Sequence, residues 1–171
     1  RRFDVDIDLH LDFDLDPSGS DLEEVCRLTD FHSRGGRVAI GHATKLSALP
    51  PEALAAAARR LADSGVALTV LPATDLYLNG RDATRLVPRG VAPAHRLAEA
   101  GVTCSLATNN VLNPFTPYGD GSLVRIANFY ANVAQLGAPA ELEGVFAMIT
   151  GSAARLMRCP DYGIAVGNPA D

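Results

Sequence analysis

The amino-terminal segment of the chain alternates polar and apolar side chains: residues 4–16 read D-V-D-I-D-L-H-L-D-F-D-L-D. This period of two predicts a β-strand, because successive side chains of a strand leave on opposite faces. A turn rich in serine and glycine follows, and the next segment predicts a helix over 20–33. Ser20 and Glu23 have the spacing of a capping box at the start of this helix, and Gly35 with the glycine after it marks its end.

Six charged or titratable residues share one face of the predicted strand: Asp4, Asp6, Asp8, His10, Asp12 and Asp14. Several like charges inside a folded core would repel one another and lose their hydration. We therefore expect either that part of this face is in contact with solvent or that Asp4 and Asp6 lie outside the regular strand.

The rest of the chain predicts alternating strands and helices. Short apolar segments predict strands at 37–42, 66–71 and 102–107. Longer segments predict helices from Pro50-Pro51 to Gly65 and over 93–100, 122–136 and 141–157. In two of these units, LADSGVALTVLP and LAEAGVTCSLAT, a helix end, a glycine, a valine and an apolar strand follow in the same order, and SRGGRVAIGH is a looser third copy.

Such a repeat indicates parallel strands joined by right-handed helical crossovers, which is an α/β architecture. Both an open doubly wound sheet and part of a (β/α) barrel fit this pattern. A whole barrel needs about 250 residues for eight units, so four strands in 171 residues amount to half of one. No glycine-rich nucleotide-binding motif follows any predicted strand, which disfavours dinucleotide and nucleoside-triphosphate sites.

Composition narrows the class of protein. Hydrophobic residues make up 47% and charged residues 20%, which is typical of a folded globular domain. The net charge of -5 argues against nucleic acid or an anionic membrane as a partner, and no apolar run approaches a membrane span. Three cysteines at wide spacing, with no signal-peptide pattern at the start, favour reduced thiols in a cytoplasmic protein.

Candidate chemistry lies where the predicted strands end, because α/β folds collect their functional groups at the carboxyl ends of the strands. His10 ends the first predicted strand, His42 ends the second, and Asn109-Asn110 end the fourth. Two histidines at neighbouring strand ends can converge on one metal ion. The alternative is that each histidine only binds a loop carbonyl, and the spacing does not decide between them. His32 and His95 fall in predicted helices, where surface positions are expected.

Five segments carry a family resemblance: VDIDLHLD, VAIGHATKLS, LPATDLYLNGR, TNNVLNPFTPYGDGS and TGSAARLMRCPDYGIAVGNPAD. In that order, they resemble the second half of a cytosine deaminase-like metal-dependent hydrolase of the amidohydrolase superfamily. The resemblance implies a distorted (β/α)8 barrel with a small β-sandwich. It implies that residues 1–171 are one partial barrel domain with strands five to eight, ending at the start of the return to the sandwich.

The resemblance also assigns roles. His10 matches a metal-binding histidine, and His42 matches a histidine that holds or polarises the metal-bound water and the substrate. Asn109 stands at the position of a metal-binding, catalytic aspartate. Asn110, Phe115 and Asn79 match substrate-contacting positions. The implied cofactor is a divalent metal, zinc or iron, and the implied partner is a small cyclic nitrogenous substrate; a homo-oligomer is compatible with the exposed edges of half a barrel.

Three features depart from the family pattern. The H-x-H motif that supplies two metal ligands is absent from this chain, Phe13 stands where the family has a proton-transferring acid, and Asn109 is a neutral amide. One function prediction is therefore a hydrolase of C–N bonds in cyclic amidines or amides, active as a longer protein and inactive as these residues alone. The alternatives are a catalytically silent relative and an α/β domain that binds a small molecule.

Overall fold

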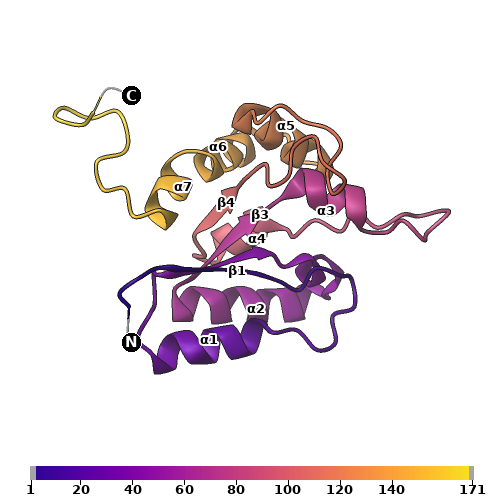
Figure 1. Ribbon diagram of the computed structural model, residues 1–171, viewed down its shortest axis with the longest axis horizontal. Coiled ribbons are helices and arrows are strands. Elements are labelled where there is room, and N and C mark those ends of the chain that lie inside the picture. Colours follow the sequence, from indigo (N-terminus) through magenta and orange to yellow (C-terminus); the bar gives the residue numbers. More distant parts are fainter. Residues whose placement is uncertain (1–2, 170–171) are drawn as a thin grey trace.

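A four-stranded parallel sheet forms the centre of the computed structural model, which describes residues 3–169 (Figure 1). The strands lie side by side in chain order: β1 (Ile7–Leu11), β2 (Val38–His42), β3 (Val66–Val70) and β4 (Cys104–Leu106). Every neighbouring pair is parallel. The α/β class, the strand order and the parallel crossovers are therefore confirmed.

The two faces of the sheet differ. One row in register contains Ile40, Leu68 and Cys104, which are buried in the main hydrophobic core. The next row contains small or polar residues: His10 on β1, Gly41 on β2, Thr69 on β3 and Ser105 on β4. The hydroxyls of Thr69 and Ser105 are 2.9 Å apart. The apolar face thus supplies the core, and the other face carries polar groups.

Seven helices and one 3-10 turn connect and cover the strands among the described residues. They are α1 (Leu22–Phe31), η1 (Thr44–Ala48), α2 (Pro51–Ser64), α3 (Pro72–Leu78), α4 (Ala94–Glu99), α5 (Leu123–Ala134), α6 (Pro139–Met148) and α7 (Gly151–Leu156). Helices α1 and α2 pack together beside β1 and β2, whereas α5, α6 and α7 lie on the β4 side (Figure 1). Side chains from both groups of helices join the same core.

The repeated glycine turn forms as the sequence predicts. Gly65 ends α2 with a left-handed φ of 64°, and its carbonyl accepts a hydrogen bond from the Gly36 amide at 2.8 Å. A Cβ at Gly65 would lie 2.9 Å from the nitrogen of Gly36, so a side chain would be crowded as well as strained. Gly101 makes the equivalent turn before β4 with φ 96°.

The predicted first strand is too long. Only Ile7–Leu11 forms β1, instead of the whole alternating segment 4–16. Asp4 and Asp6 lie before the strand, which confirms the expectation that they are outside it; both pair with Arg37, and Asp4 also pairs with Arg34. At the other end Asp12 has a φ of 53°, which turns the chain out of the extended conformation. Ion pairs and a tight turn therefore override the alternation at both ends.

The first predicted helix differs at its start. Helix α1 begins at Leu22 with Asp21 as its N-cap, and the predicted Ser20–Glu23 capping box does not form. The Ser20 hydroxyl donates to the Asp12 carboxylate instead, and the Asp21 amide donates to the same group. Asp12 therefore binds Ser20 and Asp21 ahead of the helix, and the Ser20 oxygen accepts from the Leu22 amide at 3.2 Å instead of the Glu23 amide.

Other predicted boundaries need smaller corrections. The helix predicted over 141–157 is divided into α6 and α7 by a break at Thr150, whose φ and ψ are -130° and -105°. The strand predicted over 102–107 contains only Cys104–Leu106. Helix α3 and turn η1 were not predicted, because both are too short to show a helical period.

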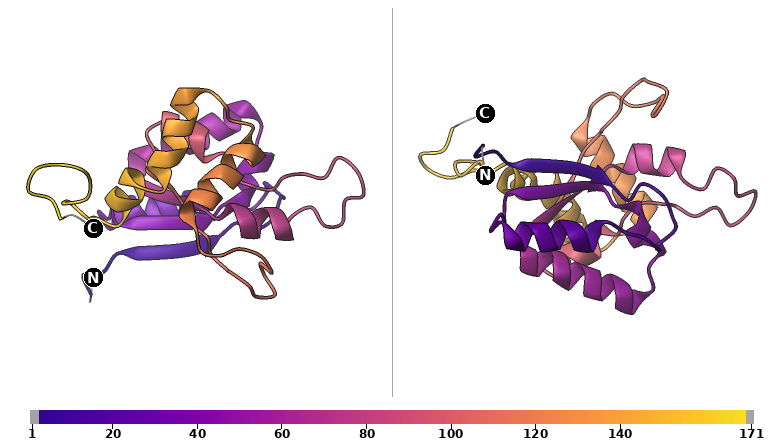
Figure 2. Two further views of the ribbon diagram at one scale, coloured as in Figure 1. Left: turned by 90° about the horizontal axis from the view of Figure 1, so that it is seen from above. Right: turned by 60° about the horizontal axis from the view of Figure 1, so that its bottom comes forward.

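The two ends of the sheet are occupied by different segments. The loops at 79–90 and 107–121 extend beyond the carboxyl ends of the strands, and the segment after α7 lies at the opposite end (Figure 2). Among residues 3–169, no helix combines the length and the apolar character needed to cross a membrane. The closing residues Ala170 and Asp171 of the expected return to a sandwich lie outside the described residues.

Candidate active site at the carboxyl ends of the strands

A hollow of about 390 Å³ lies at the carboxyl ends of the strands and opens to solvent. Its lining combines residues from four strand ends or the segments after them: His10, Phe13, His42, Thr74, Leu78, Asn109, Asn110 and Phe115. The structure therefore brings together five of the six residues that the sequence analysis assigned to a site. The sixth, Asn79, lies elsewhere: its amide donates to the Asp75 carbonyl at 3.0 Å, and its substrate role stays a prediction.

His10 and His42 are in direct contact. Nδ1 of His10 and Nε2 of His42 are 3.2 Å apart, and the two rings meet edge to face with centroids 4.8 Å apart. Gly41 makes room for this arrangement, because a Cβ there would lie 3.0 Å from Cδ2 of His10. The predicted convergence of the two strand-end histidines is confirmed.

A buried carboxylate that the sequence analysis missed supports His42. Oδ1 of Asp75 is 2.6 Å from Nδ1 of His42, and its Oδ2 accepts a hydrogen bond from the Leu71 amide at 3.3 Å. Burial raises the pKa of Asp75, and the hydrogen bond from His42 opposes that shift. The available signal was its position: Asp75 follows a predicted strand end, as the histidines do, within a segment quoted for the family resemblance.

The backbone around the hollow is strained. Asp12, His42, Ala43 and Asn109 all have left-handed φ values, between 47° and 68°, although none is glycine. Left-handed backbone is unfavourable for residues that carry a Cβ, most of all for residues other than asparagine and aspartate. Such positions concentrate at functional sites, where the surrounding structure holds them in place.

Phe13 contacts the site but offers no group that transfers a proton. Its ring lies edge to face against His42, with centroids 4.6 Å apart. The two acids beside it are engaged elsewhere: Asp12 accepts from Ser20 and from the Asp21 amide, and Asp14 pairs with Lys45 at 3.3 Å. Neither carboxylate therefore replaces the acid that the family resemblance leads one to expect at position 13.

A hydrogen-bonded turn forms the wall opposite the histidines. Oδ1 of Asn110 accepts from the side-chain amide of Asn113 at 2.7 Å, and Oδ1 of Asn113 accepts from the amides of Phe115 and Thr116. This turn places Phe115 at the rim, where 59% of its surface is exposed. Asn109 is half-buried beside it. The wall therefore offers amide groups and one aromatic ring.

The remaining histidines lie outside the hollow. His32 is exposed at the end of α1, as expected. His95 differs from the expected surface position: it is half-buried, and its Nδ1 lies 2.9 Å from the hydroxyl of the buried Tyr130. Burial lowers the pKa of His95. Its contact with Tyr130 links α4 to α5, so this residue is part of the packing between these helices.

The donor set fits part of a metal site. Two nitrogens bound to one tetrahedral Zn²⁺ at about 2.0–2.1 Å lie about 3.3 Å from each other. Nδ1 of His10 and Nε2 of His42 are close to that separation, at 3.2 Å. Within residues 3–169, no group of three or more histidine, cysteine, aspartate or glutamate side chains is placed to hold a metal ion. The described residues thus offer two imidazole ligands.

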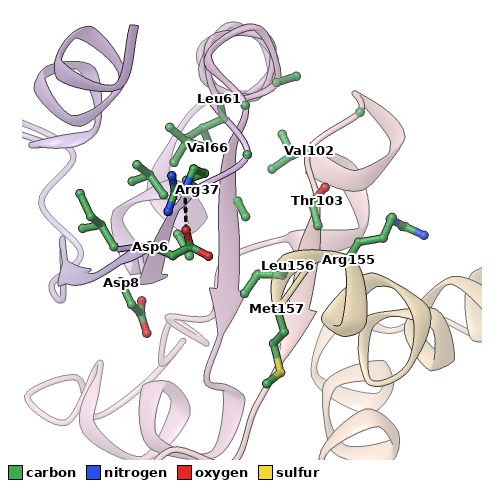
Figure 3. A pocket seen from close by; sticks show the side chains of 18 residues that line it. Asp6, Asp8, Arg37, Leu61, Val66, Val102, Thr103, Arg155, Leu156 and Met157 are labelled. Carbon is green, nitrogen blue, oxygen red and sulfur yellow. Dashed lines mark hydrogen bonds and ion pairs between the residues drawn. The ribbon is translucent and has the colours of Figure 1, made fainter. Parts of the chain in front are cut away.

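A second hollow, of about 380 Å³, lies at the amino ends of the strands. Asp6, Arg37, Leu156 and Met157 point toward it, and Asp6 and Arg37 are hydrogen-bonded to each other (Figure 3). The charged groups here neutralise one another. This hollow therefore lies between the start of β1 and the end of α7. Its described lining contains no histidine, unlike that of the first hollow.

Comparisons with known proteins show the family to which the chain belongs. The family model described as "Amidohydrolase family" matches residues 1–171. The chain is 33% identical over 98% of its length to a pterin deaminase of Rhizobium rhizogenes. It is 28% identical over its whole length to an N-isopropylammelide isopropyl amidohydrolase of Pseudomonas sp.. It spans 38% and 40% of the length of these two curated relatives.

Solved structures of related enzymes superpose on this chain. A 5-methylcytosine deaminase from Klebsiella pneumoniae with bound 5-fluorocytosine superposes with a TM-score of 0.89 at 25% identity, covering 96% of this chain and 40% of that one. A variant atrazine chlorohydrolase from Arthrobacter aurescens, complexed with zinc and atraton, has a TM-score of 0.65 at 25% identity. That match covers 99% of this chain and 35% of the chlorohydrolase.

Proposed function

Since this chain belongs to the amidohydrolase family, we propose that it is part of a metal-dependent hydrolase that cleaves a C–N bond of a small cyclic amidine or amide. The observation that carries the proposal is the contact between His10 and His42 at the floor of an open hollow. The names of the two deaminases among its relatives support a deamination of a flat nitrogenous ring. We propose a cytosine-like or pterin-like ring as the substrate, after the names of these two relatives.

The fold proposed for the longer protein is a (β/α)8 barrel in which β1 to β4 are strands five to eight. Both β1 and β4 are edge strands of the sheet. The face of the sheet that carries His10, Thr69 and Ser105 is polar and made of small side chains, which suits the narrow interior of a barrel. The chain spans about 40% of its structural relatives, in keeping with a part of a barrel.

His10 and His42 would hold a divalent metal, zinc or iron, through Nδ1 and Nε2, with the other ligands from the rest of the longer protein. When bound, such a metal lowers the pKa of a coordinated water and polarises the carbon that is attacked. Asn109 would contribute its amide oxygen at the same edge. Because an amide lacks the charge of a carboxylate, we expect weaker metal binding than with aspartate at this position.

The other lining residues would place the substrate. Phe13 and Phe115 both line the hollow with flat apolar rings, which suits a planar ring. Asn110 offers the amide through which ring nitrogens and carbonyls are recognised. The free thiols of Cys26, Cys104 and Cys159 suit the cytoplasm that we propose as its location. Assembly into a homo-oligomer also stays a proposal.

One observation favours a second candidate, a catalytically silent relative that binds a ring without converting it. Phe13 lies against His42 where a proton-transferring acid is expected, and the neighbouring acids are held elsewhere. Loss of a general acid or base costs about 10²–10⁴-fold in rate. A slow enzyme and a silent relative therefore differ in whether ammonia is released at all.

The test is ammonia release by the full-length protein supplied with zinc or iron, using cytosine, 5-methylcytosine and pterin as candidate rings. A hydrolase releases ammonia from at least one ring, and Phe13→Glu combined with Asn109→Asp increases the rate. Ring binding by calorimetry with no ammonia from wild type or the double variant would replace the hydrolase by the silent relative.

A further inference from the structure

Asp75 lies on α3, the short helix that follows β3, and its carboxylate is fully buried. The Asp75 amide donates to the Leu71 carbonyl at 3.0 Å, and the Asp75 carbonyl accepts from both the amide and the side chain of Asn79 at 3.0 Å. The residue is therefore fixed by hydrogen bonds on both sides along the chain.

Both carboxylate oxygens of Asp75 are occupied. Oδ2 accepts from the Leu71 amide at 3.3 Å, which leaves Oδ1 for Nδ1 of His42 at 2.6 Å. With Asp75 as the acceptor on both oxygens, the proton between the two side chains lies on Nδ1 of His42. A neutral imidazole with its proton on Nδ1 has a lone pair on Nε2, and this nitrogen points at His10.

We propose that Asp75 is the positioning residue of the site: it holds His42 in the Nδ1–H tautomer and directs the Nε2 lone pair toward His10 and the hollow. Both uses of Nε2, binding a metal and accepting a proton from water, require this lone pair. The consequence for catalysis rests on the proposed function, whereas the tautomer of His42 does not.

The backbone of His42 explains why such support is needed. Its φ of 68° places the ring at the end of β2 in a conformation that histidine rarely adopts. Aromatic contacts with His10 and Phe13 limit where the ring can lie, but they do not distinguish Nδ1 from Nε2. The contact between Nε2 of His42 and Nδ1 of His10 can form with either nitrogen as the donor, so it is compatible with both tautomers of His42. The hydrogen bond to Asp75 is the described contact that favours the proton on Nδ1.

Asp75→Leu and Asp75→Asn separate the loss of the hydrogen-bond acceptor from the loss of the charge. Leucine has a similar volume and accepts no hydrogen bond, so His42 loses its fixed tautomer. Asparagine keeps an acceptor oxygen without the charge. Removing the outer partner of a ligating histidine typically costs about 10–100-fold in metal affinity or activity. We expect about 100-fold for leucine and about 10-fold for asparagine, with kcat reduced more than KM is raised. Asp63→Asn makes the same chemical change at an exposed position of α2 and serves as the control.

The deciding measurement is ¹⁵N NMR of histidine-labelled, metal-free full-length protein, with His42 assigned from a His42→Gln variant. We expect the Nδ1–H tautomer in wild type and in Asp63→Asn, and a shift toward Nε2–H in Asp75→Leu. Nε2–H or a doubly protonated ring in wild type would overturn the proposal without any variant. An unchanged Nδ1–H tautomer in folded Asp75→Leu would also overturn it.

This spectrum separates the present inference from the proposed function. If the full-length protein binds no metal and hydrolyses no ring, the hydrolase proposal fails, and an Nδ1–H tautomer that depends on Asp75 still supports the positioning role. If the protein is an active metal enzyme but His42 carries its proton on Nε2, only the positioning role fails.

Discussion

The two ends of the same four strands are built differently. At the amino ends, glycines make the left-handed turns before β2, β3 and β4 (Gly36, Gly65 and Gly101), and Ser33 is also left-handed in the first of these turns. At the carboxyl ends, four left-handed residues that carry side chains follow or end the strands: Asp12, His42, Ala43 and Asn109. Left-handed backbone costs a residue with a Cβ about 1–2 kcal/mol relative to glycine. His42 and Ala43 lack the tolerance of asparagine and aspartate for this conformation, so backbone strain lies beside the candidate site.

The charged side chains at the two ends of the strands also differ in their partners. At the amino ends, acids and arginines pair with each other, as Asp4 and Asp6 do with Arg37, and Arg158 adds a contact from the carboxyl-terminal segment. At the carboxyl ends, Asp75 is buried and directed at an imidazole. We expect the first arrangement to contribute to folding stability, and we propose that the second positions a histidine of the site. Changes at the two ends should consequently affect different measurements.

The largest expected effect is that of His42→Ala on catalysis. Because His42 would bind the metal and orient the water, we expect kcat/KM for ammonia release by the full-length protein to fall by about 10²–10⁴-fold. His32→Ala is the control, since His32 is exposed at the end of α1. A folded His42→Ala variant with wild-type kcat/KM would show that His42 has no role in catalysis.

Asn109→Asp is expected to strengthen metal binding. Asparagine and aspartate both tolerate the left-handed φ of 55° found at this position, so the substitution changes charge with little strain. A carboxylate in place of an amide should raise affinity by about tenfold or more, which competition with a chromogenic chelator measures. Unchanged affinity would show that this side chain does not reach the metal.

Gly65→Ala tests the amino ends. Its left-handed φ and its 2.9 Å approach to the Gly36 nitrogen make a side chain unfavourable, so we expect the free energy of unfolding to fall by about 2 kcal/mol. Metal affinity of the folded protein should stay the same. Gly144→Ala in α6, where a Cβ would meet nothing within 4 Å, is the matched control. A loss of metal affinity in folded Gly65→Ala would contradict the division between the two ends.

Arg37→Gln should have the smallest effect, and it should depend on pH. The hydrogen bonds from Arg37 are the main cause of the lowered pKa values of Asp4 and Asp6. A lowered folded-state pKa adds stability above the unfolded value of about 3.9, and this stability is lost as the pH falls through the folded-state pKa. Urea unfolding should therefore show a small destabilisation at pH 6 that is smaller at pH 3. Arg59→Gln, exposed on α2, is the control; an effect of equal size at both pH values would contradict the assignment.

Much of the fold followed from local patterns. The glycine–valine–strand repeat predicted three parallel strands, and the rule for strand ends predicted that His10, His42 and Asn109 converge. The alternation over 4–16 overestimated β1, because Asp4 and Asp6 are bound by arginines that come more than 25 residues later in the chain. A pattern in one segment contains no information about such distant partners.

Asp75 shows the corresponding limit for the site. It lies in a seven-residue helix with no clear period, and its role depends on the end of a different strand. The half-buried position of His95 was missed for a similar reason, since its partner Tyr130 lies on another helix. Sequence patterns identified the residues at strand ends but not the residues that hold them in place.

Metal analysis of the full-length protein tests the central claim most directly. After growth with added zinc or iron, the purified wild-type protein should contain about one divalent metal ion per chain, and His10→Ala should contain much less while remaining folded. If wild-type protein contains no metal and takes none up from either supplement, or if folded His10→Ala keeps the full amount, the account of the carboxyl ends as a metal-dependent site is contradicted.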